Sequence, residues 1–322
     1  MIIGSGSYVP EKILTNQDLE KIVDTSDEWI QTRTGMKLRH IIADDENTSD
    51  MAAKAASKAI ADAGISVNEI DLIVIATISG DVGFPSTACY VQELIGAHDA
   101  AVFDISAACS GFIYGLEIAT AQIATGKYQK VLVIGVEALS RMTDYKDRNT
   151  CVLFGDGAGA VVLAPSDGKK GILQTYIRSD GRLNQLLHVP GFGTKHPPTH
   201  ENVDQRLHYI RMEGREVFKH AVKAMGDAAV KILKLTGLKS EDVSLLISHQ
   251  ANLRIIDATA KRAGIDAERV YINIDKYGNT SAASIPLALD EALKEGVLKE
   301  NDIVVLVAFG AGFTWGSAAI RI

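Results

Sequence analysis

Apolar runs of strand length recur along the chain, each after a stretch with helical periodicity. Four of these runs are rich in Val, Ile and Leu: residues 71–77, 131–135, 243–249 and 303–310. Continuous apolar strands of this kind are typical of sheets that are covered on both faces. Helical patterns at residues 49–64 and 216–237 precede the first and third runs. The alternation of buried strands with helices predicts an α/β architecture.

The pattern occurs twice. Residues 63–77 align without a gap with residues 236–250, at an offset of 173, and the apolar run at 131–135 follows the same offset. Between these segments the offset falls to 170, because Gly126 matches Gly296 as the stop that follows a helix. We therefore expect two duplicated α/β halves, residues 1–165 and 166–322, packed about a pseudo-twofold axis. A polar excursion rich in Gly and Pro separates them, at residues 188–204.

The repeat also brings polar candidates together. At the offset of 170, Cys109 corresponds to Asn279 in a Gly-Asn-Thr turn, while His249 ends the buried strand 243–249. Equivalent helix starts of a duplicated fold meet near its axis, and strand ends are where α/β folds usually build sites. We expect Cys109 to face Asn279, with His249 close by.

Cys109 has two interpretations. It precedes a helix pattern at 110–125 that is apolar nearly all round, and its neighbours are small. A free cysteine among small residues can be a buried filler. A thiol at a helix N-terminus is instead expected to ionise more easily, with its pKa below the usual value of about 8.5, and to act as a nucleophile. Cys89 and Cys151 have no comparable setting and are interpreted as fillers.

Composition and charge narrow the class of protein. The 322 residues are 47% apolar and 23% charged, as in ordinary globular chains, and the net charge of −7 argues against nucleic acid as a partner. No apolar run approaches the ~20 residues of a membrane span, and the N-terminus lacks a secretory pattern. An odd count of three cysteines argues against a disulfide framework. We expect a cytoplasmic protein without a membrane partner.

Two further signals carry no chemistry. The motif GDGAGA at 155–160 precedes a strand pattern rather than a helix, so the context of a dinucleotide loop is missing. The pair His196 and His200, in HPPTH, has no other ligand cluster in the sequence. Neither a metal nor another cofactor is expected.

Several long and unusual motifs resemble one known family. They are VDTSDEWIQTRTGMKLRHI (23–41), GFPSTAC (83–89), DISAACSGF (104–112), DRNTCVLFGDGAGA (147–160), SHQANLRI (248–255), GNTSAAS (278–284) and FGAGFTWGSA (309–318). Over essentially its whole length the chain resembles the β-ketoacyl-acyl-carrier-protein synthase III family, the initiating condensing enzymes of bacterial fatty acid synthesis within the thiolase superfamily. The resemblance implies a thiolase-like fold of two related halves, in a layered α-β-α-β-α arrangement.

The resemblance also implies a mechanism and a triad of Cys109, His249 and Asn279. Cys109 takes an acyl group from an acyl-CoA primer, with acetyl-CoA expected, and malonyl-acyl-carrier protein then loses CO2 and attacks the acyl-enzyme. His249 and Asn279 donate hydrogen bonds to the malonyl thioester oxygen. The backbone N–H groups of Cys109 and Ala311 form a separate oxyanion hole.

Binding residues are implied in the same way. The expected CoA contacts are Trp29, Arg33, Thr34, Arg148, Gly214, Phe218, Ala251 and Asn252. Phe84 is expected to reach the acyl pocket of the partner subunit in a homodimer, where pocket volume sets the primer that is accepted. The expected contacts with acyl carrier protein are Lys219, Gln250, Ala251, Asn252, Leu253, Arg254, Lys261 and Arg262.

The basic residues among these carry an independent signal. Arg254, Lys261 and Arg262 fall at i, i+7 and i+8, which places them on one face of a helix. On the pattern alone this is a solvated face, whereas the resemblance makes it a docking surface for an acidic protein.

The rival functions differ in their triads. A thiolase needs a second catalytic cysteine in the C-terminal half, and no cysteine follows Cys151. Elongating condensing enzymes pair Cys with two histidines. A chalcone-synthase-like polyketide enzyme shares Cys-His-Asn, and an acyltransferase without decarboxylation uses the same cysteine. A catalytically silent subunit that binds a partner is the alternative from a different class.

Overall fold

Two large sheets form the frame of the molecule, as seen in a computed structural model that describes residues 1–166 and 168–322. The first sheet has the strand order β1-β7-β6-β4-β5 and the second β11-β12-β13-β8. The strands of the first sheet are β1 (Ile2–Tyr8), β4 (Leu72–Ala76), β5 (Ala101–Ile105), β6 (Val131–Ala138) and β7 (Asp156–Leu163). Those of the second are β8 (Gly171–Ser179), β11 (Leu245–Ser248), β12 (Ile303–Gly310) and β13 (Thr314–Arg321).

The two sheets repeat one topology. In the first, β4 runs parallel to β6, which pairs antiparallel with β7, and β7 pairs antiparallel with β1. In the second, β11, β12, β13 and β8 follow in the same order with the same directions. The first sheet additionally carries β5 parallel to β4 at its edge. This pattern agrees with the internal repeat found in the sequence.

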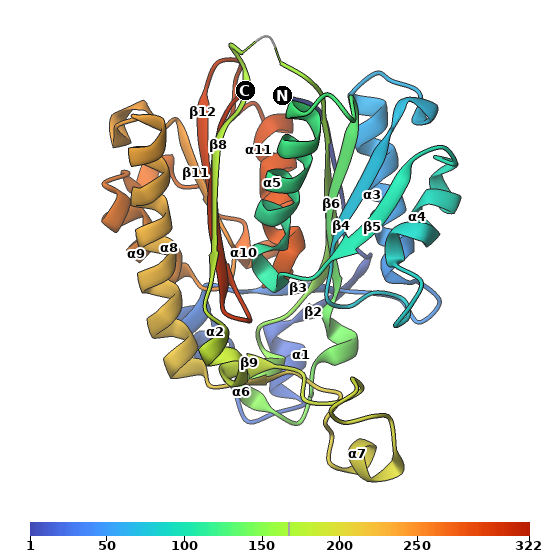
Figure 1. The fold of residues 1–322 in the computed structure, drawn as a ribbon. Helices are drawn as coiled ribbons and strands as arrows, with labels where there is room; N and C mark the ends of the chain where they lie inside the picture. The colour runs from blue at the N-terminus through green and yellow to red at the C-terminus, as the bar shows by residue number, and fades with distance from the viewer. Residues whose placement is uncertain (167) are drawn as a thin grey trace.

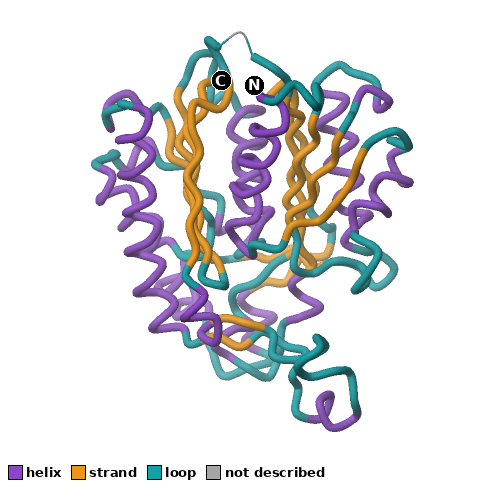
Figure 2. The backbone as a smooth tube through the Cα atoms, in the orientation of Figure 1, coloured by secondary structure: helices purple, strands orange, loops and turns teal. Residues whose placement is uncertain are grey.

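Helices fill and cover the sheets in layers. Figures 1 and 2 show α5 (Gly111–Ala124) and α11 (Ser284–Lys294) between the two sheets, α3 (Thr48–Asp62) and α4 (Thr87–Ile95) outside the first, and α8 (Gly214–Thr236) and α9 (Leu253–Ala263) outside the second. The largest apolar core cluster joins α5 and α11 to both sheets. The predicted α-β-α-β-α layers and the thiolase-like fold are confirmed.

Shorter elements gather at one end of the layers (Figure 1). They are β2 (Lys12–Thr15), α1 (Asn16–Glu20), α2 (Asp27–Thr34), β3 (Leu38–Ile41), α6 (Arg148–Cys151), β9 (Leu187–His188), α7 (His200–Asp204), β10 (Arg211–Met212) and α10 (Ile274–Tyr277). The short 3-10 turns η2 (Ala108–Ser110) and η7 (Ser281–Ala283) lie directly before α5 and α11. In the described part of the chain, no helix has the length and apolar character needed to cross a membrane.

One detail of the predicted repeat is wrong, namely the match of Cys109 with Asn279. The turns η2 and η7 start at residues 108 and 281, an offset of 173, and each opens on a left-handed non-glycine residue, Ala108 with φ of +46° and Ser281 with φ of +48°. The offset falls to 170 only later, because α11 has 11 residues where α5 has 14. The counterpart of Cys109 is therefore Ala282, and Asn279 lies before the second turn.

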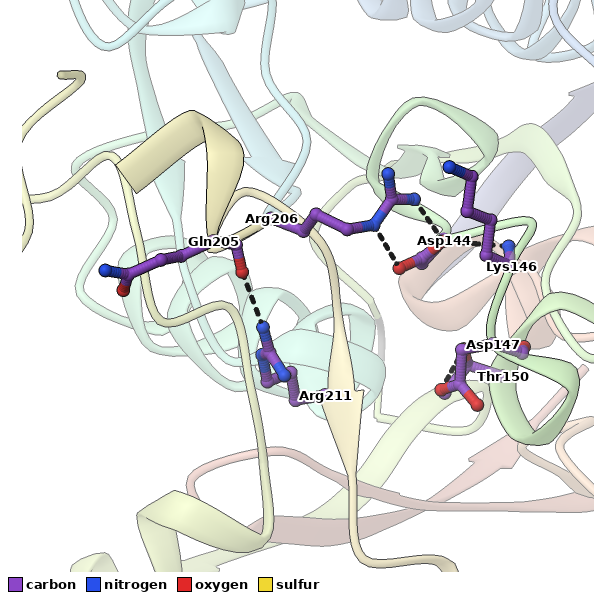
Figure 3. Close-up of polar contacts among 7 residues, drawn as sticks. All are labelled: Asp144, Lys146, Asp147, Thr150, Gln205, Arg206 and Arg211. Atoms are coloured by element: carbon purple, nitrogen blue, oxygen red, sulfur yellow. Dashed lines mark hydrogen bonds and ion pairs between the residues drawn. The ribbon is translucent and has the colours of Figure 1, made fainter. Parts of the chain in front are cut away.

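The excursion between the halves forms a lobe around α7, which projects from the body in Figure 1. Figure 3 shows how it is fastened: the Arg206 guanidinium donates to both carboxylate oxygens of Asp144, and Arg211 donates to the Gln205 carbonyl at 3.0 Å. The hydrogen bonds from Arg206 hold the pKa of Asp144 below its usual value. Asp144 lies just before α6, so the lobe is attached to the segment that carries Arg148.

Candidate active site

One cavity brings the three candidate residues together. Cys109, His249 and Asn279 all line a narrow cavity of about 180 Å³, although 170 residues separate the first from the last along the chain. The two halves therefore contribute to one site, as the repeat predicted, although the positional match behind that prediction was different.

Cys109 lies at the N-terminal end of the central helix layer. It is the middle residue of η2, and α5 begins two residues later with side chains that are fully buried, such as Phe112 and Ile113. The neighbouring Ser110 hydroxyl donates to the Thr314 carbonyl at 3.0 Å, which ties the turn to the second sheet. The buried helix thus holds the thiol at a fixed place in the cavity wall.

The sequence predicts a lowered pKa for this thiol, but its surroundings raise the pKa instead. The pKa of Cys109 is raised to about 12, mainly by burial; a hydrogen bond with Ser281 opposes this shift, and the charge of Glu137 adds to it. The mostly apolar cavity, which we call the tunnel, disfavours the thiolate more than a helix start favours it. Cys109 rests as a neutral thiol, so its attack on a substrate needs a group that receives the proton.

His249 follows the last residue of β11, and its backbone N–H donates to the Val307 carbonyl at 2.8 Å. Its Nδ1 lies 2.7 Å from the Ser284 Oγ. Burial lowers the pKa of His249 to about 3, so the ring is neutral at physiological pH. When the Ser284 hydroxyl donates to Nδ1, the ring proton is on Nε2, and His249 is a neutral hydrogen-bond donor.

Asn279 is held by its backbone and by its side chain. Its N–H donates to the Leu153 carbonyl at 2.9 Å, and its carbonyl accepts from the Gly155 N–H at 3.0 Å. The Ser281 N–H donates to the Asn279 Oδ1 at 2.9 Å. Because the amide oxygen is already bonded, the Nδ2 hydrogens remain for a ligand in the cavity.

The residues expected at the oxyanion hole lie on adjoining segments. Ala311 follows Gly310, the last residue of β12. A Cβ atom added to Gly310 would lie 2.7 Å from the backbone N of Cys109, so only glycine permits this close approach. The close contact brings the backbone of Cys109 next to the segment that carries Ala311.

The tunnel wall contains half of the expected CoA contacts. Gly214, Phe218, Ala251 and Asn252 line the same cavity as the triad. Other lining residues, most of them apolar, were not expected from the sequence: Asn149, Leu153, Phe154, Leu187, Met212, Val217, Ala221, Met225, Ile255, Phe309 and Gly310. Apolar residues in buried elements give no sequence signal that separates a tunnel wall from the core.

Three more of the expected CoA contacts cluster around one aromatic ring. The guanidinium carbons of Arg148 and Arg33 lie 4.8 Å and 5.9 Å from the centre of the Trp29 ring. The Asn252 side chain donates to the Arg33 carbonyl at 2.9 Å, which joins this cluster to the tunnel wall. Two cations and an indole ring beside a tunnel suit an adenine ring and phosphate groups.

Thr34 does not fit its expected role near the phosphates. The residue is buried, its hydroxyl donates to the Ile30 carbonyl at 2.6 Å, and the same oxygen accepts from the Met36 N–H. These bonds close the end of α2. The neighbouring Arg33, in contrast, is exposed.

The predicted basic surface is present on α8 and α9. Lys219, Arg254, Lys261 and Arg262 are exposed. The Arg254 guanidinium carbon lies 5.0 Å from the centre of the Phe218 ring, so this charge is beside the tunnel. Gln250, in contrast, is only 1% exposed and donates to the Ser248 and Tyr271 carbonyls, which rules out the expected contact with a carrier protein.

Phe84 does not line the cavity of its own chain. It is 88% exposed, in the loop that precedes α4. Phe103 is also exposed on β5, the strand at the edge of the first sheet. Phe84 is the most exposed of the large apolar side chains in the described part of the chain.

Comparisons with known proteins agree on one family. The model described as 3-oxoacyl-[acyl-carrier-protein (ACP)] synthase III matches residues 103–181, and its C-terminal counterpart matches residues 233–322. A β-ketoacyl-[acyl-carrier-protein] synthase III of Caldanaerobacter subterraneus subsp. tengcongensis is 55% identical over 320 residues, which cover 99% of this chain and 97% of that relative.

Solved structures show the same likeness. The 3-oxoacyl-[acyl-carrier-protein] synthase III of Aquifex aeolicus is 52% identical, with a TM-score of 0.93 over 100% of this chain and 99% of that one. The corresponding Thermus thermophilus structure is 44% identical, with a TM-score of 0.93 over 100% of this chain and 98% of the other.

Proposed function

The chain belongs to the 3-oxoacyl-acyl-carrier-protein synthase III family, the initiating condensing enzymes of fatty acid synthesis, and on that premise we propose how its own residues perform the condensation. The substrates are an acyl-CoA primer, with acetyl-CoA as the expected one, and malonyl-acyl-carrier protein. Cys109 is the nucleophile, and His249 and Asn279 are the hydrogen-bond donors of the triad. The observation that supports this assignment is that all three side chains line one cavity.

The first half-reaction transfers the acyl group to Cys109. The sulfur attacks the thioester carbon, the bond to the CoA sulfur breaks, and the thiol proton ends on the CoA that leaves. Cys109 rests as a thiol, and the neutral His249 ring already carries its proton on Nε2 with Nδ1 bonded to Ser284, so the thiol proton passes to the departing CoA sulfur without His249 as the base. The backbone N–H groups of Cys109 and Ala311 stabilise the oxyanion.

The second half-reaction forms the carbon–carbon bond. Loss of CO2 from the malonyl group leaves an enolate, whose oxygen accepts from the Nε2–H of His249 and the Nδ2–H of Asn279. The enolate carbon attacks the acyl carbonyl, the bond to the Cys109 sulfur breaks, and the released thiolate takes a proton from water, which restores the thiol. Two neutral donors stabilise negative charge as it develops without having to give up a proton in advance.

The direct test uses the purified chain with acetyl-CoA and malonyl-acyl-carrier protein. Intact-mass spectrometry should show an acetyl adduct on Cys109 with the first substrate alone, and then CO2, CoA and β-ketobutyryl-carrier protein with both. An adduct without the condensed product would favour an acyltransferase. The absence of an adduct would support a silent partner-binding subunit.

We propose that the exposed charges on α8 and α9 bind acyl carrier protein. Arg254→Glu should raise the KM for malonyl-carrier protein about tenfold, since a reversed charge at an interface weakens encounter with an acidic partner. The KM for acetyl-CoA should change far less. Lys127→Glu is the matched control, because Lys127 is also exposed and also near an aromatic ring, 5.2 Å from the centre of Tyr128, but follows the far end of α5. Equal losses on both substrates would contradict the docking role.

We propose that a second copy covers the edge strand β5 and receives Phe84 in its acyl pocket. Burial of a phenylalanine side chain contributes roughly 1.5–3 kcal/mol, so the exposed Phe84 and Phe103 are suited to an interface between copies. Light scattering should give twice the chain mass of 34.5 kDa. Phe103→Glu should shift the protein toward monomers at micromolar concentration. A wild-type monomer would contradict the proposed dimer.

The expected location of the protein remains the cytoplasm.

A further inference from the structure

Glu137 is a buried carboxyl group in the wall behind the triad. It is the second-last residue of β6, a strand that is otherwise apolar or small, and it is 0% exposed. Its recorded partners are uncharged hydroxyl and backbone N–H groups. Burial raises the pKa of Glu137 to about 7, although the hydrogen bonds that it accepts lower it. A carboxyl group in such a place requires an explanation.

The two oxygens of Glu137 bond to different halves of the molecule. Oε2 accepts from the segment that follows β4, namely from the Thr77 hydroxyl at 3.3 Å, the Ile78 N–H at 3.1 Å and the Ser79 hydroxyl. Oε1 accepts from the Ser281 hydroxyl at 3.1 Å, on the turn η7 of the other half. Glu137 therefore connects the two halves through Ser281, next to the site that they share.

Ser281 contacts two members of the triad. Its N–H donates to the Asn279 Oδ1, and its hydroxyl lowers the pKa of Cys109 when its hydrogen bonds to that sulfur instead of to Glu137. The residue is buried and has a left-handed φ of +48°, which serine adopts only when its surroundings hold it there. The bond to Glu137 is a direct restraint on this conformation.

We propose that Glu137 is a positioning residue of the condensing site that acts through Ser281 on two triad members. It holds the turn that orients the Asn279 carboxamide, and its protonation state decides whether the Ser281 hydroxyl proton faces the carboxylate or the Cys109 sulfur. The inference rests on the proposed function and adds a residue that touches neither substrate.

The effect of the Glu137 protonation state on the Ser281 hydroxyl follows from the number of hydrogens that the two groups carry. The Ser281 hydroxyl has one hydrogen, and an ionised Glu137 accepts it. A protonated Glu137 can instead donate from Oε1 to the Ser281 oxygen, because Oε2 already receives its donors from the opposite half. The Ser281 hydrogen is then free for the Cys109 sulfur, and the carboxylate charge that disfavours the thiolate is gone.

Glu137→Gln reproduces the protonated arrangement with the same shape. The amide oxygen takes the place of Oε2, where Thr77, Ile78 and Ser79 donate, and the amide nitrogen donates to Ser281. The test measures alkylation of Cys109 by iodoacetamide against pH, with intact-mass detection. In Glu137→Gln the rate at pH 8 should rise about three- to tenfold, because the pKa of the thiol falls.

Glu137→Ala removes the restraint on Ser281. CO2 release from malonyl-carrier protein should then lose about tenfold in kcat with little change in KM, because the Asn279 donor acts in the transition state. Asp156→Asn is the matched control: Asp156 is a buried carboxyl on the neighbouring strand β7 that accepts from Ser140 and Ile42. Thermal unfolding of each variant shows how far the fold itself is weakened.

The outcomes separate this inference from the proposed function. Unchanged alkylation in Glu137→Gln overturns the role of Glu137, as do losses in Asp156→Asn equal to those in Glu137→Ala. If Glu137→Ala does not fold, the isosteric Glu137→Gln still decides the question through alkylation alone. A wild-type protein that forms no condensed product contradicts the proposed function instead, and the alkylation result is independent of it.

Discussion

Replacing Cys109 with serine is expected to abolish acyl-enzyme formation while the protein stays folded. The substitution is nearly isosteric, but the hydroxyl is a much weaker nucleophile than sulfur in a cavity that already disfavours ionisation. Loss of the nucleophile should reduce condensation by on the order of 10³-fold or more. Intact-mass spectrometry after mixing with acetyl-CoA measures the adduct, and coupled release of CoA measures turnover.

Two control variants test whether the loss is specific to the Cys109 sulfur. Cys89→Ser changes the same atom in a cysteine whose sulfur lies 3.3 Å from the Ser86 hydroxyl, outside the cavity, and should leave turnover intact. Cys109→Ala should still release CO2 from malonyl-carrier protein, because His249 and Asn279 remain. Retained acyl transfer in Cys109→Ser, with a normal thermal transition, would show that another residue is the nucleophile.

The fold was predictable because it repeats. Continuous apolar strands such as 303–310 and the buried helix at 110–125 specified the layers, and the observed β12 and α5 match these segments closely. The register of the repeat was predicted less well. Gly126 and Gly296 are true counterparts after their helices, but the sequence does not show that the three-residue difference lies inside α11 rather than before it.

The site was predictable where a polar residue interrupts an apolar pattern at an element's end. Cys109 and His249 carry that signal, and Glu137 carries it too, as the single charge in the run VLVIGVEA, although it is not among the candidates named from the sequence. The expected roles of Gln250 and Thr34 were wrong because these residues adjoin residues of the tunnel and of the cluster around Trp29, while their own side chains donate hydrogen bonds to backbone carbonyls. Side-chain direction at such positions depends on tertiary packing.

The pKa of Cys109 also depends on tertiary packing, so its direction could not be predicted from the sequence. A helix start favours a thiolate, and sequence alone reveals the helix start. The opposing effect depends on how completely the tunnel excludes water, which is set by apolar residues from both halves, such as Phe154 and Phe309. Because desolvation dominates, the chemistry at Cys109 has to move a proton during the attack.

Removing one of the two enolate donors should separate the half-reactions. Asn279→Ala is expected to lower the rate of malonyl decarboxylation by about 10²- to 10³-fold, which corresponds to the loss of one preorganised donor. Transfer of the acetyl group to Cys109 should persist within a few fold, because its oxyanion is stabilised by backbone N–H groups. The measurements are CO2 release from malonyl-carrier protein and the acetyl adduct on Cys109.

His249→Ala should resemble Asn279→Ala. It should lose decarboxylation to a similar degree and keep acyl transfer within a few fold, because the neutral ring donates its Nε2–H to the enolate oxygen in the proposed mechanism. The decarboxylation loss in the double variant should be smaller than the product of the single losses, since both donors bond one oxygen. Fully multiplicative losses would mean that the ring and the carboxamide act on different atoms, and a large loss of acyl transfer in His249→Ala would contradict a role restricted to the enolate.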